Sequence, residues 1–90
     1  MSNNNETTRK IDITGKNEED VRQTMVRVYQ ALEEKGYNPF SQIVGYILSE
    51  DPTYITTHNN ARSLVRRINR FELLQIMLDD FMKNSTGDTD

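Results

Sequence analysis

Apolar residues recur every three or four positions in four stretches of the chain, a spacing that places their side chains on one face of a helix. These stretches predict helices over about residues 17–35, 39–50, 60–69 and 70–83. Alternation with period two is seen at Ile11 and Ile13, but that stretch is too short to form a stable strand alone. The pattern therefore predicts a compact all-α domain of four helices, or five if the turn after Pro52 is itself helical.

Residues that cap helices stand at the expected starts. Asn17, Asn38 and Asn69 are predicted N-caps, because an asparagine side-chain oxygen can accept a hydrogen bond from a backbone N–H of the first turn. Pro39 supports the second start, since its fixed φ suits the first helical position. Glu72 follows Asn69 by three residues, as in a capping box. We therefore expect a break between the third and fourth helices at Asn69.

The ends of the helices are also indicated. Gly36 is predicted to close the first helix, and Asp51 to end the second because it precedes a proline. Gly45 lies inside the second helix, where we expect it to permit a close helix crossing. The candidates for the cap of the third helix are Thr57, Asn59 and Asn60.

Each of the first three helices has one apolar face. These faces consist of Val21, Met25, Val28 and Leu32; of Phe40, Ile43, Val44, Ile47 and Leu48; and of Ala61, Leu64, Val65 and Ile68. The fourth helix differs, because its apolar residues cover an arc of about 240°, against roughly 100° for a helix packed on one side. Too few other helices exist to cover it, so we predict that it lies at a homodimer interface.

Composition gives a second reason to expect self-association. The chain has 90 residues, 34% hydrophobic, with no cysteine and one histidine. A domain of this size buries only about 60% of its unfolded surface, and neither disulfides nor zinc can stabilise it. We predict one helical domain over 11–83 between disordered tails at 1–10 and 84–90, because the end segments are polar. The lack of a long apolar run or a leader predicts a cytoplasmic protein.

Little in the sequence predicts catalysis. His58 has no cysteine to activate, and the serines stand outside the motifs of nucleophilic enzymes. The four glycines are too dispersed for a phosphate-binding loop. We therefore predict a protein that is not an enzyme, with no catalytic residue, no cofactor and no metal site.

Arginine is concentrated in the third helix. Arg62, Arg66 and Arg70 stand at four-residue spacing and predict a positive stripe on the solvent side, with Arg67 beside it. Arginine binds phosphate and carboxylate through paired hydrogen bonds. Three interpretations stay open: a solvated helix face, a recognition helix that meets DNA, or a surface for an acidic partner or a phosphorylated segment of this chain.

The N-terminal tail contains candidate phosphorylation sites. Thr7 and Thr8 lie in the polar segment ETTRK, where a kinase could reach a hydroxyl group. A phosphate there would add about −1.5 to −2 charges. Such a group would complement a positive surface on the same molecule.

The segment YNPFSQIVGYILSEDPTYITTHNNAR, residues 37–62, closely resembles the signature of the IreB family of small bacterial regulatory phosphoproteins. The similarity extends over about residues 20–80. It implies an all-helical homodimer without catalytic activity that is a substrate of a PASTA-type Ser/Thr kinase and of its phosphatase. It also implies control of cell-wall synthesis and antibiotic tolerance, in some bacteria by promoting Clp-dependent degradation of the enzyme that starts peptidoglycan precursor synthesis.

Residue by residue, the resemblance implies that Thr7 best matches the family's phosphoacceptor, with Thr8 the next match. Family arginines that matter for regulation match Arg62, Arg66 and Arg70. This chain departs from the family at Asn4, where some members have a threonine, at Glu50, where glycine is common, and at Thr56 and Thr57, where Pro-Arg is common.

The interpretation that combines these features is a phosphorylation-controlled adaptor whose arginine face engages a partner. Phosphate on Thr7 would occupy that face or disturb the contact. Expected partners are a second copy of the chain, a Ser/Thr kinase and phosphatase, and a protein of cell-wall regulation or Clp proteolysis, with no membrane. The alternative is a small helix-turn-helix DNA-binding protein, although a net charge of −3 gives no general attraction to nucleic acid.

Overall fold

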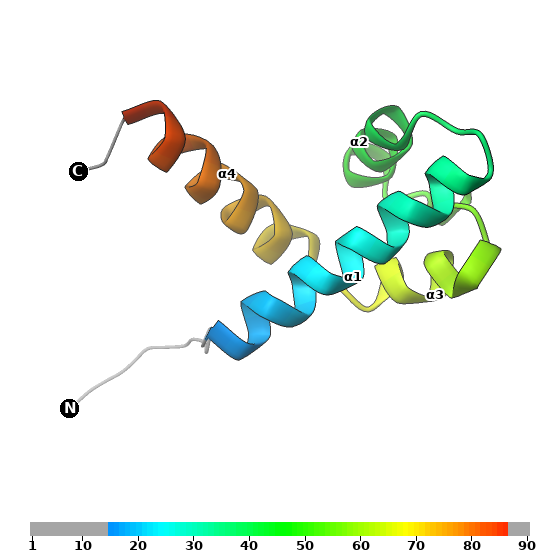
Figure 1. The fold of residues 1–90 in the computed structure, drawn as a ribbon, viewed down its shortest axis with the longest axis horizontal. Coiled ribbons are helices and arrows are strands. Elements are labelled where there is room, and N and C mark those ends of the chain that lie inside the picture. Colours follow the sequence, from blue (N-terminus) through cyan, green and yellow to red (C-terminus); the bar gives the residue numbers. More distant parts are fainter. Residues whose placement is uncertain (1–14, 87–90) are drawn as a thin grey trace.

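The computed structural model describes residues 15–86. The predicted N-terminal tail and residues 87–90 of the predicted C-terminal tail lie outside the described residues, whereas residues 84–86 of that tail are helical, so the prediction is wrong for them. Its regular elements are α1 (Gly15–Glu34), α2 (Pro39–Ser49), the 3-10 turns η2 (Pro52–Tyr54) and η3 (His58–Asn60), α3 (Ala61–Arg66) and α4 (Arg70–Thr86). Figure 1 shows α2 and α3 on two sides of the C-terminal half of α1, with α4 extending away from them. Residues 15–86 thus confirm the predicted all-α domain of four helices.

The first helix ends as its sequence predicts and begins earlier. Gly36 is left-handed at φ 84°, Tyr37 N–H donates to the Leu32 carbonyl (2.9 Å), and Gly36 N–H donates to the Glu33 carbonyl (3.0 Å). This pair of bonds is the Schellman arrangement, which satisfies carbonyls that the helix leaves open. The prediction of Asn17 as N-cap is wrong, because α1 already begins at Gly15.

The second helix has the predicted start. Asn38 Oδ1 accepts from the Ser41 N–H (3.1 Å), and Pro39 occupies the first helical position. The helix ends at Ser49, followed by Glu50 in the left-handed conformation at φ 64°. Asp51 then caps η2 by accepting from the Thr53 N–H (3.0 Å), which confirms the short helical turn after the second helix.

Gly45 faces a side chain from the following turn, η2. A Cβ atom at Gly45 would lie 2.4 Å from Cε1 of the Tyr54 ring in η2. The expected helix crossing is therefore wrong, because the space that glycine leaves is occupied by the Tyr54 ring. Gln42 joins the same turn by donating from Nε2 to the Tyr54 carbonyl (2.9 Å).

The third helix is shorter than predicted. It spans only Ala61–Arg66, and neither Thr57 nor Asn60 caps it through a side chain. Both Asn59 (φ 52°) and Asn60 (φ 62°) are left-handed, a conformation that asparagine tolerates better than most residues. The predicted break at Asn69 is confirmed, since Asn69 Oδ1 accepts from the Glu72 N–H (3.1 Å) at the start of α4.

The core lies between α1, α2, α3 and the loop that holds Ile55. Its buried residues are Val21, Val28, Ala31, Leu32, Tyr46, Ile47, Ile55, Ala61, Val65 and Leu73. The predicted faces of α1 and α3 supply half of these side chains, and Met25, Leu64 and Ile68 of the same faces pack against the core. The predicted face of α2 is confirmed at the buried Ile47 and wrong in part, because Phe40, Val44 and Leu48 are exposed and Tyr46, which was not predicted, is buried. Part of this helix therefore has no cover within the described chain.

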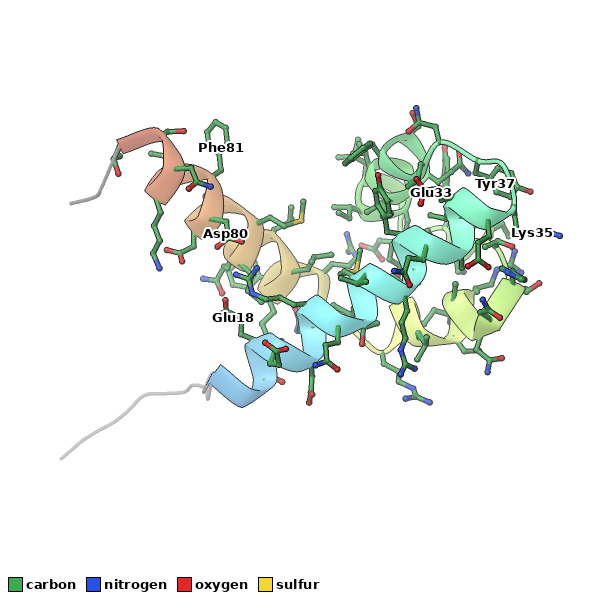
Figure 2. All side chains as sticks on the ribbon, in the orientation of Figure 1. Glu18, Glu33, Lys35, Tyr37, Asp80 and Phe81 are labelled. Atoms are coloured by element: carbon green, nitrogen blue, oxygen red, sulfur yellow. The ribbon has the colours of Figure 1, made fainter. Side chains whose placement is uncertain are left out.

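The fourth helix is the least buried element. Within α4 only Leu73 is buried, with Ile76 half-buried beside the core, and the helix runs to Thr86, past its expected end at 83. Figure 2 shows Phe81 on the side of α4 that points away from α1. The wide apolar arc predicted for this helix is thus present, and most of it is exposed.

Candidate functional site

The arginines predicted to form one stripe are divided between two helices. Arg62 and Arg66 belong to α3, whereas Arg70 begins α4 after a bend. The single continuous stripe is therefore wrong, because α3 ends at Arg66 and helical spacing does not carry over to residue 70. Each guanidinium consequently has a different environment.

Arg62 and Arg70 bind backbone carbonyls of other segments of the same chain. Arg62 Nε donates to the Ile55 carbonyl (2.8 Å), and Arg70 Nη1 donates to the Ile47 carbonyl in the last turn of α2 (2.6 Å). Arg70 also pairs with the carboxylate of Glu50, the left-handed residue that ends α2. Both side chains are half-buried, so they stabilise the junction of α2, the loop and α4.

Arg66 lies between these two and differs from both. It is exposed, and its guanidinium has no hydrogen-bond or ion-pair partner within residues 15–86. Of the three predicted arginines it is thus the one whose donors all remain available to an external anion. A recognition helix for DNA is not favoured by this geometry, since α3 has only six residues and ends at Arg66.

Acidic and polar residues surround the loop before α3. The Thr53 hydroxyl and N–H groups, helped by the charge of Arg62, lower the pKa of the Asp51 carboxyl. Glu34 Oε1 lies 2.7 Å from His58 Nε2, which joins the end of α1 to η3. The lone histidine thus contacts the end of α1. Thr7 and Thr8, the predicted phosphorylation sites, lie outside the described residues.

An apolar groove runs between α1, α2 and α4 and has a volume of about 500 Å³. Its apolar lining consists of Val21, Met25, Val26, Tyr29, Phe40, Ile43, Val44, Leu73, Ile76 and Met77. The rings of Tyr29 and Phe40 meet edge to face with centroids 5.4 Å apart. Figure 1 shows α2 and α4, which supply two of its walls, at separate places along α1.

Ion pairs hold α4 against α1 at the edge of this groove. Arg22 Nη1 lies 2.9 Å from Asp80 Oδ2, and Arg22 Nη2 lies 2.6 Å from Glu18 Oε2. The hydrogen bond to Arg22 lowers the pKa of Asp80, and the bonds to Asp80 and Glu18 raise the pKa of Arg22. Figure 2 shows Glu18 and Asp80 facing each other across the space between the two helices.

The sequence did not single out Arg27 as a candidate. This residue is exposed on α1 and lines a second hollow together with Arg67, next to the bend between α3 and α4. No local motif marks it, because the arginines that share this hollow are 40 positions apart in sequence. Only helix packing brings them to one surface.

These features define a small all-helical domain, whose candidate sites are an apolar groove and arginine-bearing surfaces. Within residues 15–86 no cluster of three His, Cys, Asp or Glu side chains could hold a metal ion. Among the same residues, no helix combines the length and apolar character needed to cross a membrane.

Comparison with known proteins gives the family. The model of the IreB regulatory phosphoprotein family matches residues 6–83. A UPF0297 protein of Ruminiclostridium cellulolyticum is 50% identical over 76 residues, covering 84% of this chain and 86% of the relative. A UPF0297 protein of Acetivibrio thermocellus is 48% identical over 87 residues, covering 97% of this chain and 94% of the relative. The chain belongs to the IreB family of regulatory phosphoproteins, which implies a non-enzymatic role.

Proposed function

We propose that this chain is a cytoplasmic regulatory phosphoprotein, phosphorylated by a PASTA-type Ser/Thr kinase and dephosphorylated by the cognate phosphatase. It controls peptidoglycan synthesis and antibiotic tolerance by binding a protein partner and steering proteolysis of the enzyme that starts precursor synthesis. The proposal is supported by the family match over residues 6–83, a range that includes Thr7 and Thr8.

Arg66 is the residue we assign to direct partner contact. The observation that carries this assignment is its exposed guanidinium without a partner among the described residues, between two arginines that bind carbonyls. Arg62 and Arg70 hold the backbone on either side of it. A carboxylate or phosphate of the partner would meet an exposed, positively charged corner at Arg66, whose free donors can form paired hydrogen bonds.

We further propose that the chain functions as a homodimer. Phe71, Leu78 and Phe81 on α4 are 69%, 60% and 64% exposed, and Phe40, Val44 and Leu48 on α2 are also uncovered. Contiguous apolar surface of this kind marks interaction sites in soluble proteins. A second copy would cover α4 and fill the groove beside α2.

Binding to the precursor-synthesis enzyme tests the adaptor proposal. Arg66→Ala should weaken the affinity for the enzyme by roughly 5- to 150-fold. This is the range of affinity changes that typical coupling free energies between regulated sites produce. Thr7→Glu should weaken it in the same direction, because it imitates part of the phosphate charge, whereas Thr7→Ala should bind as the parent does and resist regulation by the kinase. The measurement is calorimetric titration of the precursor-synthesis enzyme with each full-length variant.

Lys35→Ala is the control, since Lys35 is another exposed cation, at the far end of α1. It should leave the affinity unchanged. Equal affinity of the parent chain, Arg66→Ala and Thr7→Glu would overturn the adaptor proposal.

A further inference from the structure

Arginines from two helices meet at a hollow of about 400 Å³ between the N-terminal half of α1 and the bend that joins α3 to α4. Arg27 belongs to α1, and Arg67 is the C-cap residue directly after α3. Both side chains are exposed. Thr24 and Asn69 add polar groups to the same lining. The hollow is distinct from the corner at Arg66 and from the apolar groove.

Charges of both signs line this hollow without pairing with one another. Arg27, Arg67, Asp20 and Glu72 all face it, yet within residues 15–86 none of their side chains has a hydrogen-bond or ion-pair partner. Elsewhere on α1 the nearby charges do pair, as Arg22 does with Glu18 and Asp80. The hollow is therefore suited to a ligand that carries an anion and cations together.

We propose that this hollow binds the chain's own N-terminal segment when Thr7 or Thr8 is phosphorylated, with the phosphate on Arg27 and Arg67. The inference rests on the proposed function, because it requires phosphorylation of this segment. Phosphothreonine offers three acceptor oxygens and about −1.5 to −2 charges. Two guanidiniums from different helices can grip it from two sides.

The chain length permits this placement. Thr8 and Thr7 precede Gly15 by seven and eight residues, which span about 23 to 29 Å when extended. Arg27 lies twelve residues into α1, about 18 Å along the helix axis. The segment can therefore reverse direction at the start of α1 and still bring its phosphate to Arg27.

The order of charges along the N-terminal segment also matches the order of opposite charges along the hollow. Arg9 and Lys10 stand between the threonines and Gly15, and so would pass nearer the start of α1 than the phosphate does. Asp20 lies five residues into α1 and, with Glu72, supplies carboxylates to the hollow. The phosphate would thus meet the arginines while the two tail cations meet the carboxylates. A phosphate without the following cations would leave Asp20 and Glu72 unmatched.

Docking at this hollow explains how a tail phosphate could control a partner contact at Arg66. Arg66 and Arg67 are consecutive, about 100° apart around the helix. A segment bound at Arg67 would therefore lie beside the partner surface. Regulation would arise from obstruction next to Arg66, with no need for the phosphate to occupy Arg66 itself.

NMR of arginine side chains in the full-length chain tests the site directly. Phosphothreonine is installed at Thr8, and in a second preparation at Thr7, and the ¹⁵N-labelled Nε–H signals are compared with the unmodified chain. The Arg27 and Arg67 signals should shift in at least one preparation, independently of protein concentration, while Arg66 should not. Shifts confined to Arg62, Arg66 or Arg70, no shift at all, or shifts lost on dilution would each overturn same-chain docking at this hollow.

Removal of the phosphate by a non-specific phosphatase gives a second readout. Docking should protect the phosphate, so that Arg27→Ala and Arg67→Ala speed its release about fivefold or more, while Arg66→Ala, the matched control, leaves the rate unchanged. Arg9→Ala with Lys10→Ala should also speed release, because it removes the cations that match the carboxylates. Slower release in that double variant would contradict the proposed charge order.

The two proposals can fail separately. If phosphorylation leaves the Arg27 and Arg67 NMR signals unshifted while partner binding is sensitive to Arg66→Ala, only the docking site is rejected. Persistent shifts with partner binding insensitive to Arg66→Ala and Thr7→Glu would reject only the adaptor model.

Discussion

Three residues other than glycine adopt the left-handed conformation in residues 15–86, one directly after α2 and two in η3 before α3. They are Glu50 (φ 64°), Asn59 (φ 52°) and Asn60 (φ 62°). For most side chains this conformation costs about 1 to 2 kcal/mol per residue. Glu50 is the least suited of the three, because asparagine tolerates this conformation better than glutamate does. Its ion pair with Arg70 offsets part of the strain.

Variants at Glu50 separate backbone strain from the ion pair. Glu50→Ala removes the carboxylate and keeps a Cβ atom at positive φ, whereas Glu50→Gly removes both. We expect the glycine variant to be more stable than the alanine variant by about 1 kcal/mol in free energy of unfolding, because glycine adopts this φ without strain. Urea denaturation of the two variants gives the difference. Equal stabilities would show that the strain at residue 50 is negligible.

At the scale of elements, the turn from α2 to α4 depends on arginines that look alike in sequence. Arg70 satisfies a carbonyl in the last turn of α2, where helical carbonyls lack intrahelical partners. Arg62 does the same for the loop at Ile55. Arg66 contributes to neither junction, so its charge is available for function.

Stability measurements distinguish these two roles. Arg70→Ala should lower the free energy of unfolding by about 1 to 2 kcal/mol, because the Ile47 carbonyl loses a charged donor. Arg66→Ala should change it by less than about 0.5 kcal/mol, as expected for an exposed side chain without contacts. Both values come from urea denaturation at one protein concentration. A large loss at Arg66 would argue that it has a structural role and weaken its assignment to the partner surface.

At the scale of the whole molecule, α4 is the element that a single copy leaves uncovered. Its first turns join the core through Leu73, and Arg22 binds Asp80 further along. The opposite side carries Phe71, Leu74, Leu78, Phe81 and Met82, all exposed. A small domain with this much apolar surface gains stability when a partner covers it.

Light scattering after size exclusion tests the dimer. The parent chain should have twice the monomer mass, and Phe81→Asp should shift it toward the monomer, because a buried carboxylate at the interface lacks a partner. Asn84→Asp is the matched control on α4, since Asn84 is an exposed polar residue on the side of the helix away from Phe71 and Leu78, and should remain dimeric. A parent chain that is monomeric at all concentrations would reject the homodimer.

The sequence by itself determined the helical class, the Asn38 and Asn69 caps and the Gly36 end, because these depend on residues within a few positions of one another. Helical spacing also identified the buried faces of α1 and α3. The resemblance of residues 37–62 led to the IreB family, and the family match confirms it.

Tertiary structure decided which charged and apolar groups are available. Spacing alone placed Arg62, Arg66 and Arg70 on one face, but packing against α2 and the loop uses two of them and leaves Arg66 exposed. Arg27 and Arg67 share a hollow only because α1 lies against the end of α3. Hydrogen-bond partners far apart in sequence cannot be read from local periodicity, so these surfaces became visible only in the folded chain.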